Sequence, residues 1–347
     1  LGLARARAGS LRFARSQVWL LDAWLRRAAS VDAEASVEFD EAEAFELVRA
    51  RARRLLESAS LDPPATFRGE LRDYQRAALG WFEALREAGV GGCLADDMGL
   101  GKTVQVLAYL EARRLAGAGP MLVVAPRSVV HQWLQEAQRF APELPTFEHG
   151  GTGRATDPGT FVAGTLVVTS YGTLRRDVEL LEQVDFDVVV LDEANAVKNP
   201  ASQTARSALR LRGAVRLALT GTPIENSLGD LWALSEFMNP GLLGGRETYE
   251  RLLALSGAGV ARAEALAPLR RVIAPFFLRR TKGEVLASLP PRTEQSVLLT
   301  ASPEEQQRYE ALRAVVYDEV VQRQSGKLGL RALEGLLRLR QEACHPG

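Results

Sequence analysis

The sequence predicts an α/β fold in which helices cover both faces of a parallel, doubly wound sheet. Short and almost uninterrupted apolar runs recur along the chain, at residues 92–95, 121–125, 165–169, 186–191 and 215–220. Such runs are typical of strands that are buried on both faces. Segments with helical apolar spacing alternate with them, which favours parallel strands joined by crossover helices. Polar motifs follow several of the runs, at the strand ends where such sheets bind ligands.

Composition limits what this fold can do. A chain of 347 residues is long enough for one large domain or two smaller ones. Its 43 basic and 43 acidic residues cancel, so global charge favours neither nucleic acid nor membrane as a partner. No apolar run reaches the ~18 residues of a membrane span. Two cysteines without metal-ligand spacing, Cys93 and Cys344, fit a reducing cytoplasm.

The two ends of the chain are those expected for a piece of a longer protein. The chain begins at Leu1 rather than Met, its first arginines precede no signal-peptide core, and Gly347 looks like a cut. Residues 1–62 are rich in Ala, Arg, Glu and Leu and carry a roughly helical apolar stripe between residues 41 and 56. They are predicted to be a fragment of an upstream helical region, bounded by the prolines at 63 and 64.

Helices are predicted on both sides of the strand region. Apolar residues at helical spacing run from Leu71 to Leu85 and stop at Gly89. After residue 227 the pattern becomes helical throughout, with stripes over 228–237, 253–271, 303–323 and 333–343. The predicted organisation is an upstream fragment (1–62), an α/β lobe (63–240) and a helical extension (241–347).

The octapeptide DDMGLGKT at residues 96–103 joins the first apolar run to a helical segment. A glycine turn before a helix directs several backbone N–H groups at one anion, with the positive end of the helix behind them. Lys102 would then reach the β- and γ-phosphates, and the Thr103 hydroxyl would ligate Mg²⁺. Asp96 stands where the general phosphate-loop pattern has glycine, so a chance match remains the alternative for this motif alone.

Two adjacent carboxylates, Asp192 and Glu193, end the apolar run at 186–191. At the ligand edge of the sheet, Asp192 is placed to hold Mg²⁺ and Glu193 to orient or deprotonate an attacking water. A solvated acidic turn is the alternative. Thr220 and Thr222 flank a glycine at the end of the next run, where two hydroxyls could sense a γ-phosphate, or simply form a strand-exit turn.

At this point the residues resemble the first motor lobe of the Swi/Snf family, the helicase-like chromatin-remodelling ATPases of helicase superfamily two. The resemblance spans about residues 68–347. Its ordered motifs are LRDYQ (71–75), DDMGLGKT (96–103), VVAPRS through Trp133 (123–133), VTSY (168–171), LDEA with KNP (191–200), TGTP with Asn226 and LW (220–232), FLRRTK (277–282), LPPR (289–292) and LRLRQ with HP (337–346).

This resemblance implies a RecA-like ATP-binding lobe that uses ATP and Mg²⁺ and moves along duplex DNA, remodelling or displacing bound protein. Gln75 matches the adenine-reading position. The implied nucleotide-binding residues are Gln75, Asp97, Met98, Gly99, Leu100, Gly101, Lys102, Thr103 and Thr220. Lys102, Asp192 and Glu193 would be catalytic, and Thr103 and Asp192 would ligate Mg²⁺. Backbone contacts to DNA are expected around Pro126, Arg127, Thr169 and Ser170.

The resemblance also carries departures. Asn195 stands where the family usually has histidine or glutamine, which bears on coupling of the γ-phosphate to the third motif. No second lobe follows, and the family keeps its arginine fingers there, which contribute ~10³–10⁵ in rate in related enzymes. The isolated fragment is therefore expected to turn ATP over poorly. Richness in Ala and Arg favours a bacterial, cytoplasmic, nucleoid-associated member.

Two rival functions stay open on the sequence. One is another superfamily-two motor, such as an RNA polymerase-recycling ATPase, for which the polymerase would be a partner, or a restriction translocase. The other is a nucleotide-gated binding scaffold without turnover. Among the remaining polar candidates, Arg279, Arg280 and Lys282 either contact phosphate or end a helix. Trp81, Trp133 and Trp232 lie in helical apolar stripes and are predicted to be buried in the core. His131 and His149 have no partner at metal-ligand spacing.

Overall fold

A computed structural model describes the protein at residues 5–7, 10–12, 55, 57–221, 228–245, 273–285, 302–321 and 328–344. Two compact units divide the chain, Leu1–Ala287 and Ser288–Gly347. Each unit is described by itself. The first unit contains the predicted sheet, and the second contains two helices.

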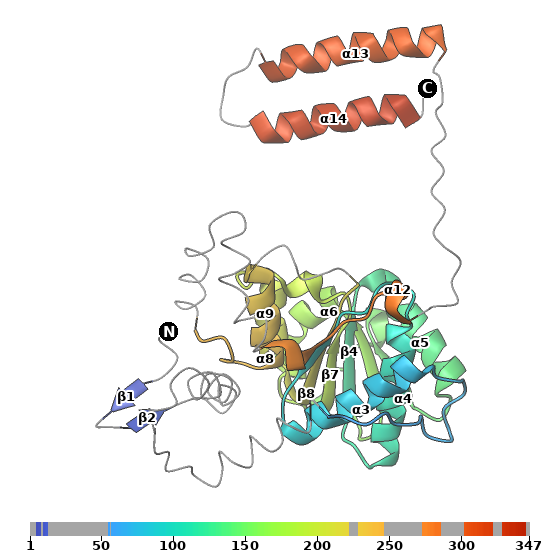
Figure 1. Cartoon of the computed structure of the whole chain (residues 1–347), viewed down its shortest axis with the longest axis vertical. Coiled ribbons are helices and arrows are strands. Elements are labelled where there is room, and N and C mark those ends of the chain that lie inside the picture. Colours follow the sequence, from blue (N-terminus) through green and yellow to red (C-terminus); the bar gives the residue numbers. More distant parts are fainter. Residues whose placement is uncertain are drawn as a thin grey trace. The chain divides into compact units, whose positions relative to one another are not determined.

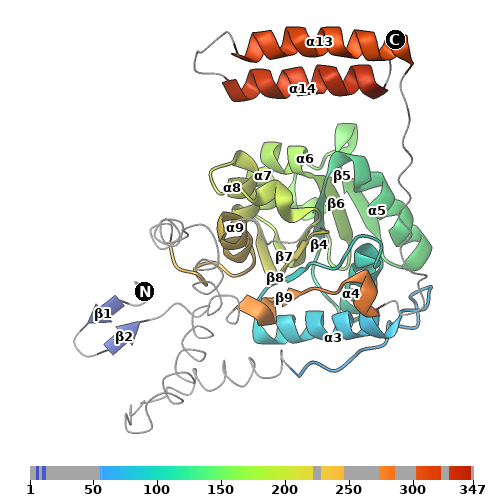
Figure 2. The same ribbon diagram turned by 45° about the horizontal axis from the view of Figure 1, so that its top comes forward.

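The sheet has seven strands in the order β5-β6-β4-β7-β8-β3-β9, and every pair is parallel. In chain order the strands are β3 (Gly92–Leu94), β4 (Met121–Ala125), β5 (Thr146–His149), β6 (Leu166–Ser170), β7 (Asp185–Leu191), β8 (Arg212–Leu219) and β9 (Phe277–Leu278). Figure 2 shows them side by side within a layer of helices. The predicted doubly wound parallel sheet is confirmed.

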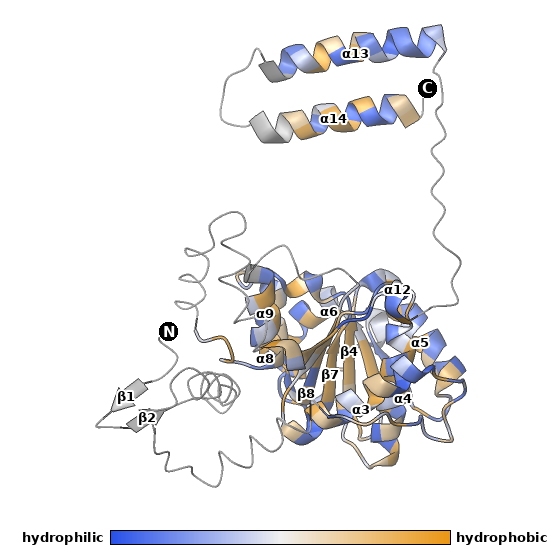
Figure 3. Cartoon of the chain, in the orientation of Figure 1, coloured by the Kyte–Doolittle hydropathy of each residue, from blue (hydrophilic) through white to orange (hydrophobic). Residues whose placement is uncertain are grey.

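The central strands are apolar because both of their faces are covered. Along β4, Met121 and Val123 face one buried cluster, and Leu122 and Val124 face the other. Figure 3 shows the same strands among the most hydrophobic parts of the chain. Strands β5 and β9 were not predicted, because neither is a long apolar run. β5 reads Thr-Phe-Glu-His at the sheet edge, half of it exposed, and β9 has only two residues.

Helices of this unit lie on both faces of the sheet (Figures 1 and 2). One buried cluster takes its helical residues mainly from α3 (Asp73–Ala88), α4 (Lys102–Leu115) and α5 (Arg127–Phe140). The other takes them from α6 (Tyr171–Arg176), α7 (Val178–Leu181), α8 (Gln203–Arg210) and α9 (Leu228–Met238). The predicted stripe from Leu71 to Leu85 forms α3, which ends at Gly89 in the left-handed conformation (φ 66°) that favours glycine.

A segment far along the chain returns to the sheet. After the short helix η5 (Ala274–Phe276), strand β9 pairs with β3, and α12 (Lys282–Val285) follows. The predicted boundary at residue 240 stays a prediction. The structure adds that Phe277 and Leu278, from the predicted helical extension, belong to the central sheet.

The upstream fragment is described only in part. Arg5–Arg7 (β1) and Ser10–Arg12 (β2) pair as antiparallel strands. The prediction of an upstream helical region stays a prediction. The predicted stripe at 41–56, apart from Leu55, and the predicted helix at 253–271 lie outside the described residues.

The second unit is a pair of helices, α13 (Pro303–Val321) and α14 (Leu328–Cys344), which cover the two last predicted stripes. Val316 is buried between them, against Gly335. Ion pairs join Arg308 to Glu342 and Arg338 to Glu319. Across the described ranges of both units, every helix is too short or too polar to cross a membrane.

Candidate nucleotide and metal site

Three polar motifs end three neighbouring strands. The phosphate loop follows β3, Thr220 follows β8, and the acidic pair follows β7, with β8 between the other two. Neighbouring strands lie roughly 4.8 Å apart, so the ends of β3 and β7 are about 10 Å apart across the sheet. The topology therefore brings the phosphate loop, Thr220 and the acidic pair to one rim, within reach of one extended polyphosphate.

Left-handed glycines shape the loop after β3. Gly99 has φ 87° and Gly101 has φ 76°, and Gly101 immediately precedes the first residue of α4. Met98 at the loop tip is 65% exposed. Lys102, the first residue of α4, folds back over the loop, and its Nζ donates to the Asp96 carbonyl at 2.7 Å. An ammonium and a helix start thus face the same concave turn.

Lys102 also lies beside the other two motifs. A Cβ atom built on Gly221 would be 3.5 Å from Lys102 Nζ, which places the Thr220–Gly221 turn against the ammonium. Burial lowers the pKa of Lys102. The negative charges that oppose this fall in pKa come, in decreasing order, from Asp96, Glu193, Asp192 and Asp97. Lys102 and the acidic pair, which are distant in sequence, therefore lie close enough to interact electrostatically.

Asp192 is held from two sides. Its Oδ2 accepts a hydrogen bond from Trp133 Nε1 at 2.8 Å, and its Oδ1 accepts one from the Glu193 N–H at 2.9 Å. The Tyr171 hydroxyl donates to the Asp192 carbonyl at 2.7 Å. Burial, and then the charges of Asp192 and Glu193, raise the pKa of Tyr171 well above its ordinary value, so the phenol stays a donor.

Glu193 has a left-handed backbone, with φ 47° and ψ 56°. It is the one residue other than glycine with a positive φ in the described ranges. Such a conformation costs about 1–3 kcal/mol and persists where the surrounding structure imposes it. Here the hydrogen bond from its N–H to Asp192 holds the turn, which directs the chain away from the strand directly after the acidic pair.

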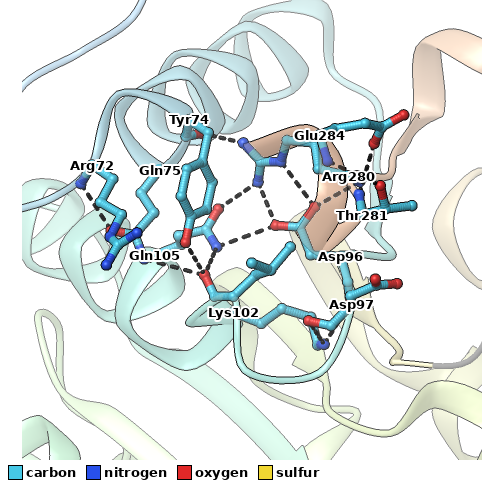
Figure 4. A network of polar contacts seen from close by, with 11 residues as sticks. Arg72, Tyr74, Gln75, Asp96, Asp97, Lys102, Gln105, Arg280, Thr281 and Glu284 are labelled. Carbon is cyan, nitrogen blue, oxygen red and sulfur yellow. Dashed lines mark hydrogen bonds and ion pairs between the residues drawn. The ribbon is translucent and has the colours of Figure 1, made fainter. Parts of the chain in front are cut away.

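The position expected of a phosphate-loop glycine carries a buried ion pair. Asp96 is fully buried and accepts hydrogen bonds from Arg280, through the backbone N–H at 3.1 Å and Nε at 2.9 Å. The guanidinium also donates to Gln105 Oε1 at 2.7 Å and to the Tyr74 carbonyl, and it lies over the Tyr74 ring. Figure 4 shows this network, which joins the loop to α3, α4 and the segment after β9. Arg280 therefore serves the loop rather than an external phosphate.

The adenine-reading candidate is also tied to the loop. Gln75 Nε2 donates to the Leu100 carbonyl at 3.1 Å, and Gln75 Oε1 accepts from the Arg72 N–H at 2.9 Å. The Tyr74 hydroxyl donates to the same carbonyl at 3.0 Å. Both ends of the Gln75 amide thus bind backbone in this structure, beside the phosphate loop (Figure 4).

The expected DNA contacts lie at the starts of two helices. Pro126 and Ser170 precede the first residues of α5 and α6, and Arg127 is exposed. Ser170 Oγ accepts from the Thr173 N–H at 3.1 Å. The buried Thr169 hydroxyl donates to the His149 carbonyl at 2.7 Å.

The remaining candidates are structural. Trp81, Trp133 and Trp232 are buried as predicted, although Trp133 additionally binds Asp192. His149 is fully buried, with Nε2 3.0 Å from Asp177 Oδ2, and His131 is exposed beside Gln135. The sequence marked Trp133 by its apolar stripe and as the end of a family motif, but neither pattern indicates where its indole N–H is bonded. Thr222 and Asn226 lie outside the described residues.

The residues at this rim fit Mg²⁺. That ion is usually held by one or two carboxylates, waters and substrate phosphates rather than by an all-protein cage. The described part of the chain contains no cluster of three or more His, Cys, Asp or Glu side chains arranged to hold a metal. Each Asp192 oxygen accepts one protein hydrogen bond and keeps a second lone pair.

Known proteins resemble this chain closely. YwqA of Bacillus subtilis, provisionally named an ATP-dependent helicase/translocase, is 36% identical over 288 residues, which cover 81% of this chain and 31% of YwqA. The Arabidopsis thaliana ISWI chromatin-remodeling complex ATPase CHR17 is 37% identical over 260 residues, covering 73% of this chain and 24% of CHR17. The SWI2/SNF2 ATPase core of Sulfolobus solfataricus in complex with dsDNA matches with TM-score 0.60 and 33% identity, over 83% of this chain and 61% of that chain.

The chain spans about a third or less of the length of these two curated relatives. The SNF2-related domain itself matches residues 74–347, which include the phosphate loop, the acidic pair and the segment that carries Arg280. With the parallel sheet, and with three motifs gathered at one rim, the conclusion is direct: this chain belongs to the SNF2-related family of Swi2/Snf2 ATPases.

Proposed function

We propose that this chain is the ATP-binding lobe of a DNA-dependent ATPase that moves along duplex DNA and remodels or displaces protein–DNA complexes. The observation that carries the proposal is the position of Lys102. Its ammonium lies against the Thr220–Gly221 turn and within the electrostatic reach of Asp192 and Glu193. One triphosphate at this rim would meet a cation, a turn with hydroxyls and two carboxylates together.

Each motif has a distinct role in this proposal. The backbone of Asp97 through Gly101 and the start of α4 bind the phosphates, and Lys102 neutralises their charge. Gln75 supports the nucleotide from α3. Glu193 orients the attacking water and accepts its proton, and the buried Thr220 contacts the γ-phosphate region and registers its loss.

Asp192 and Thr103 would hold Mg²⁺. When bound there, the ion would help to neutralise the charge of the phosphates. The chain's own contribution is orientation, because Trp133 and the Glu193 N–H fix the Asp192 carboxylate before any ligand binds. With its half-buried position, that carboxylate is constrained yet accessible from the rim.

Duplex DNA is proposed to contact the starts of α5 and α6, around Pro126, Arg127 and Ser170. Support comes from the dsDNA complex of the Sulfolobus solfataricus relative and from the exposure of Arg127. Thr169 would contribute through its backbone, since its hydroxyl is already bonded. Contacts of this kind hold the phosphate backbone and carry no sequence information.

The test is ATP hydrolysis by the complete protein, with and without duplex DNA. We expect duplex DNA to stimulate hydrolysis, and Lys102→Ala to abolish it while the protein remains folded. Arg127→Ala should weaken stimulation, whereas Arg139→Ala, a basic residue at the other end of α5, serves as the matched control. Stimulation by RNA or by RNA polymerase instead would support the recycling ATPase, and tight ATP binding without turnover would support the scaffold.

A further inference from the structure

Two aromatic side chains from different helices meet at one acidic residue. Trp133 from α5 binds the Asp192 carboxylate, and Tyr171 from α6 binds the Asp192 carbonyl. The indole is 1% exposed, so this hydrogen bond is shielded from water. Asp192 is therefore connected to two helices on opposite faces of the sheet, in addition to its own strand.

The same two helices begin at the segments proposed to hold DNA. α5 starts after Pro126, and Trp133 lies six residues beyond Arg127, about 9 Å along the helix axis. α6 starts after Ser170, and Tyr171 is its first residue. A bound phosphate backbone that displaces either helix start would therefore also displace the aromatic side chain that is bonded to Asp192, because the helix between them is short and rigid.

A comparison of the three described tryptophans shows that this contact is specific. The Trp81 indole donates to the Pro275 carbonyl at 3.1 Å, and the Trp232 indole donates to the Gly244 carbonyl at 3.2 Å. Both acceptors are backbone groups, which any fold must satisfy. Trp133 alone among these three donates to a carboxylate, and that carboxylate is the proposed metal ligand.

Packing accounts for a large apolar ring at this place, but not for the N–H group that this ring carries. A phenylalanine would fill most of the same apolar volume without bringing a donor that needs a buried partner. The N–H group that Trp133 adds serves Asp192 by selecting one orientation of its carboxylate. Groups that orient a metal ligand in this way commonly change metal affinity or activity by 10–100-fold when they are removed.

We propose that Trp133 is a positioning residue for Asp192, and that Trp133 and Tyr171 carry the effect of bound duplex DNA to the metal side of the nucleotide site. The proposal rests on the proposed function for its DNA arm. Its metal arm concerns Mg²⁺-dependent nucleotide binding and stands independently of turnover.

The experiment compares Trp133→Phe with Trp81→Phe in the complete protein. Both substitutions remove a buried indole N–H and a similar volume, but only the first touches Asp192. Affinity for a fluorescent ATP analogue is measured in EDTA and across a Mg²⁺ titration, followed by ATPase rates with and without duplex DNA. Tyr171→Phe, which deletes one hydroxyl, repeats the test should Trp133→Phe fail to fold.

For Trp133→Phe we expect the half-saturating Mg²⁺ concentration to rise about 10-fold, unchanged affinity in EDTA, and a reduced ratio of DNA-stimulated to basal rate. Trp81→Phe should match the wild type in all three quantities: the half-saturating Mg²⁺ concentration, the affinity in EDTA and the ratio of DNA-stimulated to basal rate. Equal Mg²⁺ titrations for the two variants would overturn the positioning role. A shifted titration with an unchanged stimulation ratio would overturn the link to DNA. Absence of DNA stimulation in the wild type would refute the proposed function and leave the metal arm measurable.

Discussion

Two aspartates at the ends of two strands of one sheet are used in opposite ways. Asp96, after β3, is fully buried and bound by the backbone and guanidinium of Arg280. Asp192, after β7, is half-buried and receives one hydrogen bond on each oxygen. The carboxylate of Asp96 is thus fully engaged by Arg280, whereas the carboxylate of Asp192 can still accept further hydrogen bonds or a metal ion.

This difference separates the structural and chemical parts of the site. At β3 the acid fixes the shape of the phosphate loop by tying it to α3, α4 and the returning strand β9 (Figure 4). At β7 the acid is oriented but remains able to bind something else. Substitutions at the two ends should therefore affect different measurable quantities, activity at β7 and stability at β3.

The largest expected effect is at the β7 end. Glu193→Gln removes the group proposed to accept a proton from water, and general-base catalysis typically contributes 10²–10⁴-fold. We expect kcat for ATP to fall by about that factor while a fluorescent ATP analogue still binds and the thermal midpoint is unchanged. Hydrolysis at the native rate would show that Glu193 has another role.

At the β3 end, Asp96→Asn should reduce stability rather than act on chemistry directly. The change leaves the Arg280 guanidinium, 12% exposed, without its charged partner. Removing one member of a buried pair costs about 3–5 kcal/mol, which denaturant unfolding would measure. The control is Glu182→Gln, whose partner Arg210 lies at the surface, where a pair contributes about 0–1 kcal/mol. Equal losses in the two variants would contradict the comparison.

A smaller effect is expected from Arg280→Lys. Lysine keeps the charge but loses the planar fork that reaches Asp96, Gln105 and the Tyr74 carbonyl together. We expect a loss of about 1–3 kcal/mol, less than for Asp96→Asn, in the same unfolding measurement. A variant as stable as the wild type would mean that charge alone holds the loop.

The smallest effect is a shift in pH dependence. Burial lowers the pKa of Lys102 below its ordinary value of 10.5. Because the ammonium is the form that binds phosphate, nucleotide affinity should fall as pH rises through this lowered pKa. Glu193→Gln removes a negative charge that opposes the lowering, so the fall should begin at lower pH. Glu136→Gln, at a half-buried position of α5, should leave the profile unchanged. If Glu193→Gln also left the pH profile unchanged, the charge of the acidic pair would have no effect on Lys102.

The sheet and the meeting of the three motifs could be predicted because they depend on local patterns. A buried parallel strand is an apolar run, and whatever follows it lies at the ligand rim. The pattern at Phe186 through Leu191 and the loop at Gly99 through Thr103 were sufficient to place Asp192 and Lys102 at one edge.

The supporting contacts could not be predicted, because they depend on distant partners. Arg280 binds Asp96 across 184 positions of sequence, through a two-residue strand too short to show a period. Trp133 belongs to the apolar stripe of α5 and ends a family motif in the sequence, but only the fold brings its N–H to Asp192. Strand β5 was missed because an edge strand does not have to be apolar.

At Glu193, a left-handed backbone coincides with the residue proposed to act on the attacking water, so folding and the proposed activity make opposite demands there. Glycine there would relax the turn and, by folding criteria alone, would be the better choice by about 1 kcal/mol. A lineage that no longer needed hydrolysis would therefore gain by losing this glutamate. Persistence of this glutamate in a variant collection grown under selection would indicate that hydrolysis is required, whereas replacement by glycine would indicate that it is not.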